Sequence, residues 1–157
     1  MSGPDVDTRP CPPSELRAEL RAAVRLLAET YGLGDVEAQA VGCVATRWER
    51  PPGWFGKLLS RGGSTRYGAV LMTPSHLVWS VTDGRTDTTA NGARLSELEL
   101  RPSDQVPGGD AWGLHVHGQL LRGSEQHASA WITLGEGDAT ATFRRALEER
   151  VTAARAR

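Results

Sequence analysis

The sequence is poor in the residues and runs that build disulfide frameworks, zinc sites and membrane spans. It has only two cysteines, Cys11 and Cys43, whose spacing fits neither a C-x-x-C pair nor a set of zinc ligands. A reducing compartment fits this usage better, and a disulfide between the two cysteines is the alternative. No apolar run approaches the roughly 20 residues that cross a bilayer, and residues 1–13 lack a signal-peptide pattern. The sequence therefore predicts a cytoplasmic protein.

The chain also lacks a strong charge and the motifs of common enzymes. A formal net charge of −1 argues against a surface built for nucleic acid. No G-x-S-x-G elbow, Walker loop, H-E-x-x-H or G-x-G-x-x-G motif occurs, so we expect no catalytic residues, no cofactor and no enzymatic activity. His115 and His117 share one face of a predicted strand and could bind a metal with His76 or His127. Two ordinary histidines on a sheet face are the simpler interpretation, and no metal site is predicted.

What the chain does contain is enough apolar sequence for one domain. It has 157 residues, of which 39% are hydrophobic and 24% charged. Residues 1–13 are polar and proline-rich, which predicts a disordered tail. Residues 14–34 read as an amphipathic helix that Ser14 caps and Gly32 ends. Its apolar stripe must pack on the sheet of this domain or on a partner subunit, and the interface residues are Leu20, Val24 and Leu27.

Most of the remaining sequence alternates between apolar and polar residues, as strands with one buried face do. Asp83-Gly84 and Asn91-Gly92 are hairpin signals, and broken alternation near Ser96-Glu97 indicates a bulge. A last helix starts at the cap Asp138. Seven short antiparallel strands must curl into a barrel or a sandwich, which this helix can cover. The predicted strands are 40–49, 66–72, 76–82, 85–91, 94–101, 111–121 and 128–134.

The chain resembles the pleckstrin-homology-like (PH-like) superfold, in particular its small bacterial domains. The resemblance rests on the run GAVLMTPSHLVWS followed by LSELEL, on the seven strands and on the C-terminal amphipathic helix. The resemblance covers about Ala40–Ala156, and we assign residues 38–157 to a PH-like domain. It implies an α+β fold, a bent antiparallel barrel of about seven strands with a C-terminal capping helix, to which residues 14–34 add an N-terminal helix. Members bind phosphoinositides, peptides or other proteins, and some assemble into rings, so the family implies binding but no single ligand.

The least ordinary segment is residues 53–66, where large apolar side chains alternate with basic ones. The resemblance places these cations near the first inter-strand loop, where lipid-binding members grip phosphates. Such a segment can touch an anionic membrane, whereas the competing interpretation is a short helical turn that plugs the core. The residues that would contact a membrane or a partner are Trp54, Phe55, Lys57, Leu58, Arg61 and Arg66.

We therefore expect a non-enzymatic PH-like binding module that mediates protein–protein interaction or self-assembly through its strand edges or its N-terminal helix. One alternative is peripheral binding to an anionic membrane through the basic and aromatic loop 53–66. Another is a carrier of a small apolar ligand, in a pocket lined by Trp79 and Trp112.

Overall fold

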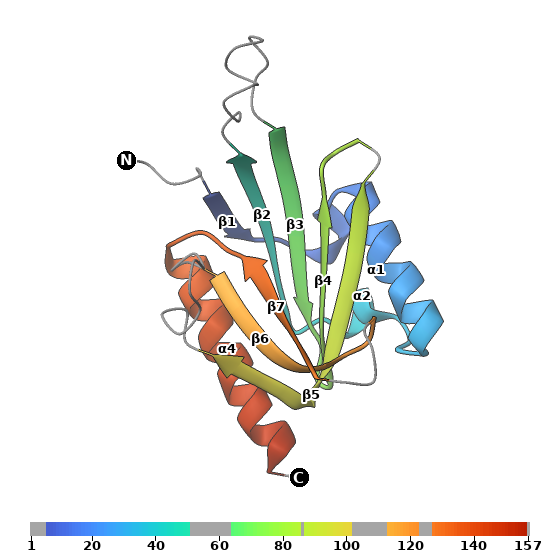
Figure 1. Cartoon of the computed structure of the whole chain (residues 1–157), viewed down its shortest axis with the longest axis vertical. Coiled ribbons are helices and arrows are strands. Elements are labelled where there is room, and N and C mark those ends of the chain that lie inside the picture. Colours follow the sequence, from blue (N-terminus) through green and yellow to red (C-terminus); the bar gives the residue numbers. More distant parts are fainter. Residues whose placement is uncertain (1–5, 51–63, 86, 102–112, 123–126, 157) are drawn as a thin grey trace.

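The computed structural model describes residues 6–50, 64–85, 87–101, 113–122 and 127–156. These residues form one antiparallel sheet of seven strands, in which each strand pairs with its neighbour along the chain (Figure 1). The strands are β1 (Val6–Pro10), β2 (Gly42–Arg50), β3 (Ser64–Met72), β4 (His76–Thr82), β5 (Thr88–Arg101), β6 (Gly113–Leu120) and β7 (Ala128–Thr133).

Three helical segments lie between β1 and β2, and one long helix follows β7 in the described part of the chain. They are η1 (Pro13–Glu15), α1 (Ala18–Tyr31), α2 (Val36–Gln39) and α4 (Asp138–Arg155). The α+β class, the seven-stranded antiparallel sheet and the C-terminal helix are confirmed.

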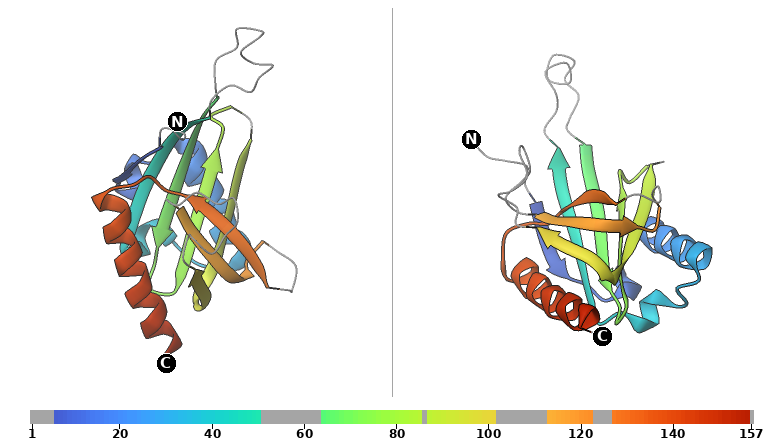
Figure 2. Two further views of the ribbon diagram at one scale, coloured as in Figure 1. Left: turned by 60° about the vertical axis from the view of Figure 1, so that its left-hand side comes forward. Right: turned by 60° about the horizontal axis from the view of Figure 1, so that its bottom comes forward.

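The sheet curls strongly, and a helix covers each of its faces (Figures 1 and 2). Helix α1 packs on the outer face against β4 and β5, whereas α4 lies across the inner side against β5, β2 and β1. Strand alternation sorts the buried side chains between these two layers. Leu71 of β3 joins the outer cluster under α1, and the next residue, Met72, joins the inner cluster under α4.

The curled sheet does not close, because β1 and β7 are its two edges and share no ladder in the described residues. A side-chain contact links β1 to the segment that follows β7. The Thr8 hydroxyl accepts a hydrogen bond from the Gly135 N–H at 2.6 Å and contacts the Thr46 hydroxyl at 2.9 Å. A Cβ atom on Gly135 would lie 2.5 Å from the Val6 carbonyl oxygen, so glycine permits this close approach.

The prediction of a disordered tail is wrong for residues 6–13. Residues 6–10 pair with β2, and the chain then forms the turn η1. Ser14 lies in this turn and does not cap the helix. Leu16 is extended, with ψ 154°, so α1 begins only at Ala18. The predicted end is confirmed, because Gly32 adopts the left-handed conformation with φ 67°.

The apolar stripe of α1 packs against the sheet of its own chain. Leu20, Val24 and Leu27 are only 1–3% exposed and belong to the outer cluster. Of the two surfaces that the sequence left open for this stripe, the structure shows the sheet of the same chain and not a partner subunit. The sequence shows the stripe but not which surface covers it.

Helix α2 is held to α1 by one carboxylate. Glu37 accepts hydrogen bonds from the guanidinium groups of Arg21 at 2.7 Å and Arg25 at 2.7 and 2.9 Å. These bonds, above all the one from Arg21, hold the pKa of Glu37 below its ordinary value. The segment between β1 and β2 is thus a small packed unit on the outer face.

The two strands predicted at 85–91 and 94–101 are one bent strand, β5, so the Asn91-Gly92 hairpin is wrong. The Asn91 side-chain oxygen accepts bonds from the Gly92 and Arg122 N–H groups. A Cβ on Gly92 would lie 2.9 Å from the Leu77 carbonyl oxygen, so this glycine serves close packing and not a turn. The predicted bulge is confirmed by a register shift between Ala93 and Leu98.

Helix α4 agrees with its predicted range and buried face. The predicted cap is wrong by one residue, because Asp138 is the first residue of the helix and Gly137 occupies the cap position. Phe143, Leu147 and Val151 recur at steps of four and enter the inner cluster. No helix among the described residues combines the length and apolar character needed to cross a membrane.

Candidate functional site

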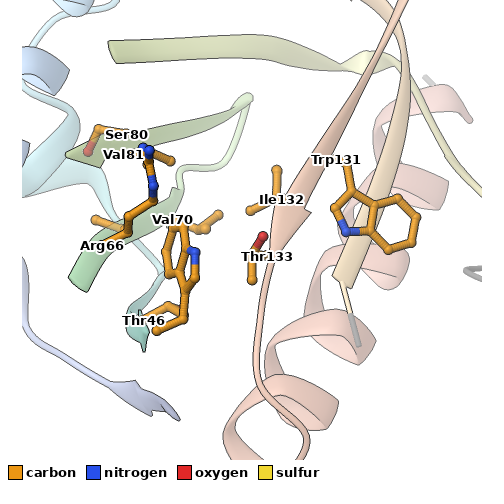
Figure 3. A pocket seen from close by; sticks show the side chains of 11 residues that line it. Thr46, Arg66, Val70, Ser80, Val81, Trp131, Ile132 and Thr133 are labelled. Atoms are coloured by element: carbon orange, nitrogen blue, oxygen red, sulfur yellow. The ribbon is translucent and has the colours of Figure 1, made fainter. Parts of the chain in front are cut away.

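A cleft of about 310 Å³ opens on the inner face of the sheet, between the ends of β2 and β3 and the opposite strand β7. Figure 3 shows its walls, with Arg66 on one side and Ile132 on the other. The ring of Trp131 lies beyond β7 in this view, and its neighbour Ile132 points toward the cleft. The lining residues are Thr46, Trp48, Arg66, Gly68, Ala69, Val70, Ser80, Val81, Trp131, Ile132 and Thr133.

Strand alternation places Arg66 in this cleft. Its neighbour Tyr67 belongs to the other face, where the Arg17 guanidinium lies 3.9 Å above the phenol ring. Arg66 is directly opposite Trp48 in the β2–β3 ladder. A Cβ on Gly68 would lie 3.2 Å from Cζ3 of Trp48, so the indole covers this glycine. An arginine and a tryptophan thus share one wall.

Arg66 is the only charged side chain among the described residues that line the cleft. Its Nε atom is buried and has no hydrogen-bond partner in the part of the chain that the structure describes. The Arg66 side chain as a whole is only partly buried, and its guanidinium stays protonated in proteins. An anion that entered the cleft could accept a hydrogen bond from the Nε–H group and would be stabilised by this charge.

Two hydroxyl groups of the walls already have partners. The Thr46 hydroxyl contacts that of Thr8 at 2.9 Å. The Ser80 hydroxyl donates to the Leu20 carbonyl oxygen on the opposite face of the sheet. The other lining residues include the apolar side chains of Trp48, Val70 and Ile132 and the hydroxyl group of Thr133. The cleft therefore offers one cation beside an aromatic and aliphatic wall.

Only one of the six residues predicted to contact a membrane or a partner can be placed. Arg66 lines the cleft, whereas Trp54, Phe55, Lys57, Leu58 and Arg61 lie outside the described residues. Sequence reasoning missed the pairing of Arg66 with Trp48. Counting residues back along both strands from a correct hairpin register would have found it.

The predicted pocket between Trp79 and Trp112 is not the cleft. Trp79 is 7% exposed and packs within the inner cluster. Trp112 lies outside the described residues. A sequence gives the number of large aromatic side chains, but it does not show which of them are fully enclosed.

His115 and His117 share one face of β6, as predicted, and this face is opposite to the one that Leu114 and Val116 give to the inner cluster. His115 stacks near Trp131 at a ring distance of 5.7 Å, and burial, Arg101 and His117 lower its pKa. His117 contacts the Ser129 hydroxyl at 2.9 Å, and its ring lies 5.8 Å from that of His127. The described residues contain no cluster of three or more side chains that could hold a metal ion.

Comparisons of this chain with protein-family models, with curated proteins and with solved structures found no match. The resemblance to PH-like domains therefore stays a prediction from sequence. The residues of the cleft are therefore the basis for the proposed function.

Proposed function

We propose that this protein is a non-enzymatic binding module of PH-like architecture, whose cleft receives a small anionic group attached to an apolar portion. The observation that carries the proposal is the buried Nε atom of Arg66, which lacks a hydrogen-bond partner among the described residues. The carboxylate or phosphate of a ligand would supply this partner in a charge-assisted hydrogen bond.

The size and walls of the cleft support an amphipathic ligand. About 310 Å³ is the lower end of the range of small-molecule sites, so only a short apolar portion fits beside the charge. Trp48 and Ile132 would cover that portion. A purely apolar ligand would leave the Arg66 charge unpaired, and we therefore expect it to bind more weakly.

Two sources share this ligand chemistry. One is a free amphipathic anion, such as an alkyl carboxylate or phosphate. The other is the headgroup of an anionic lipid, which would make the protein a peripheral membrane binder through Arg66 and the loop 53–66. The two sources differ in their dependence on a bilayer and in their sensitivity to salt.

The first test measures binding of hexyl phosphate and of the uncharged hexanol by calorimetry. We expect hexyl phosphate to bind and hexanol to bind at least about tenfold more weakly, because only the phosphate pairs with Arg66. Arg66→Gln should remove this preference. Arg47→Gln is the matched control, because Arg47 lies on the neighbouring strand, exposed and paired with Glu49 at 3.0 Å.

The second arm uses vesicles of neutral lipid with and without phosphatidylglycerol, at low and moderate salt. Binding to anionic vesicles alone, lost with Arg66→Gln, would assign the cleft to a lipid headgroup. Binding of hexyl phosphate alone would assign it to a soluble ligand. If neither binds at low salt, or if Arg66→Gln binds as well as Arg47→Gln, the proposal is wrong.

A second candidate function is self-assembly by strand addition at β7. This strand is an edge of the sheet, with β6 as its only ladder partner in the described residues. An edge strand of this kind can pair with a strand of another copy. Light scattering should then give a multiple of 16.9 kDa. Ser129→Lys should shift the mass toward the monomer, and a monomeric mass at every protein concentration would exclude self-assembly.

A further inference from the structure

The two cysteines of the chain face each other across the β1–β2 ladder. The last registered pair is Pro10 with Val44, and continuing this register by one residue places Cys11 opposite Cys43. The Cys11 N–H donates to the Cys43 carbonyl oxygen at 3.1 Å, which extends the ladder to this pair. Residues far apart in sequence are thus direct cross-strand neighbours.

Both side chains also lie on the same face of the sheet. Each is partly buried and packs against the outer cluster under α1. Opposite residues of an antiparallel pair have Cα atoms about 4.5–5.5 Å apart, which falls within the range of about 4.4–6.8 Å that a disulfide requires. The structure has no bond between the two sulfur atoms.

We propose that Cys11 and Cys43 form a redox modification site, which a small disulfide such as oxidised glutathione converts into an intramolecular disulfide. The Cys11 thiolate attacks one sulfur of the oxidant, which releases one glutathione thiolate and leaves a mixed disulfide on Cys11. The Cys43 thiol gives its proton to water, and its sulfur then attacks the Cys11 sulfur. The second glutathione leaves as a thiolate, and the two glutathione thiolates take up two protons. Two protein thiols are oxidised and one glutathione disulfide is reduced.

The surroundings of the two sulfurs determine the order and rate of these steps. Burial, then Glu15, raises the pKa of Cys11, and burial raises that of Cys43 to about 12. Cys43 is therefore the poorer nucleophile, and Cys11 attacks first. A thiol of high pKa is only slightly ionised at pH 7, and its thiolate is a poor leaving group. The disulfide should therefore form faster at pH 9 than at pH 7 and resist reduction once formed.

The position of Cys11 and Cys43 in the fold determines how a disulfide between them would affect stability. The chain leaves the sheet at Cys11 and returns to it at Cys43, and η1, α1 and α2 lie between. A disulfide would join the two ends of this segment covalently and hold β1 at the edge of the sheet. By restricting the unfolded chain, it should raise the melting temperature by about 5–10 °C.

The test treats the whole protein with oxidised glutathione at pH 8 to 9 and measures its intact mass. We expect a monomer about 2 Da lighter, without free thiols or bound glutathione, and with a higher melting temperature. Cys43→Ser should trap one glutathione on Cys11, because the resolving thiol is missing. Cys11→Ser should react more slowly than Cys43→Ser.

Three results would overturn the proposal. The wild type could retain glutathione on Cys11 as Cys43→Ser does, it could form covalent dimers, or it could form the internal crosslink without a rise in melting temperature. The reduced forms of both variants serve as the folding control. Their melting temperatures show whether a serine has disturbed the sheet before any oxidant is added.

Discussion

At the scale of single residues, His115 shows what burial does to a titratable side chain. It is 9% exposed, and its Nδ1 atom has no hydrogen-bond partner among the described residues. Burial is the largest cause of its lowered pKa, followed by the charges of Arg101 and His117. The folded protein therefore prefers the neutral imidazole, whereas the unfolded chain takes up a proton near the ordinary value of 6.5.

This preference predicts acid sensitivity. As the pH falls below about 6.5, the unfolded state binds more protons than the folded state, so the free energy of unfolding should decrease until His115 also protonates in the folded protein. Urea unfolding at a series of pH values measures this slope. His115→Gln should reduce it, and His76, whose pKa burial also lowers, should account for part of the remainder.

His127→Gln is the matched control, because it removes an exposed imidazole and leaves the buried one in place. A wild-type free energy of unfolding that does not change between pH 7 and pH 5 would contradict the assignment of a neutral, buried His115.

At the scale of elements, α1 contains two adjacent leucines with opposite environments. Leu27 is 3% exposed and packs on the sheet, whereas Leu26 is 66% exposed. Leu27→Ala should lower the free energy of unfolding by about 2–4 kcal/mol, and Leu26→Ala should change it by less than about 0.5 kcal/mol. Urea unfolding of both variants makes the comparison.

The same two variants also test whether α1 packs on the sheet of its own chain or contacts another copy of the protein. Because the stripe lies on its own sheet, Leu27→Ala should leave the solution mass unchanged while the folded state persists. A change of mass at full folding would instead show that α1 contributes to an interface between copies.

Elements with strong periodicity were predictable, and short ones were not. The stripe of α4 repeats over several turns, and its face agrees with the structure. Strand β1 is only VDTRP, which has no clear alternation and ends in a proline. It forms because β2 supplies a ladder and Thr8 reaches Gly135, and both contacts are with residues distant in sequence. A local pattern contains neither contact.

The cleft was predictable only in part, for the same reason. Arg66 was noticed because basic residues are concentrated near it in the sequence. Its place in a cleft depends on its pairing with Trp48 and on the curl of the sheet that brings Ile132 opposite. The number of basic residues in a segment can be read from the sequence. The walls of the cleft come from strands that are distant in sequence, and a local pattern does not show that they lie together.

At the scale of the whole molecule, two buried clusters share one sheet. The strands between them supply side chains to both, as Leu71 and Met72 of β3 do. Neither cluster can be exposed without losing strands that the other needs. We therefore expect the protein to unfold in a single transition, as small domains usually do.

Substitutions in the two clusters test this expectation. Leu27 belongs to α1 and the outer cluster, Leu147 belongs to α4 and the inner cluster, and both side chains are buried. Leu27→Ala and Leu147→Ala should each lower the same melting temperature when unfolding is followed by far-UV and by near-UV circular dichroism. If Leu27→Ala splits the curve into two transitions, α1 and the outer cluster melt independently of the sheet.

The contact between Thr8 and Gly135 also bears on how the chain folds during synthesis. Strands β2 to β7 pair only with sequence neighbours, so their hairpins can form one after another as they leave the ribosome. The Thr8 hydroxyl can meet Thr46 as soon as β2 is made, but the Gly135 N–H group that donates to it comes 127 residues later. Strand β1 is made first, yet its edge of the sheet acquires this link to the β7 end only after Gly135 has emerged.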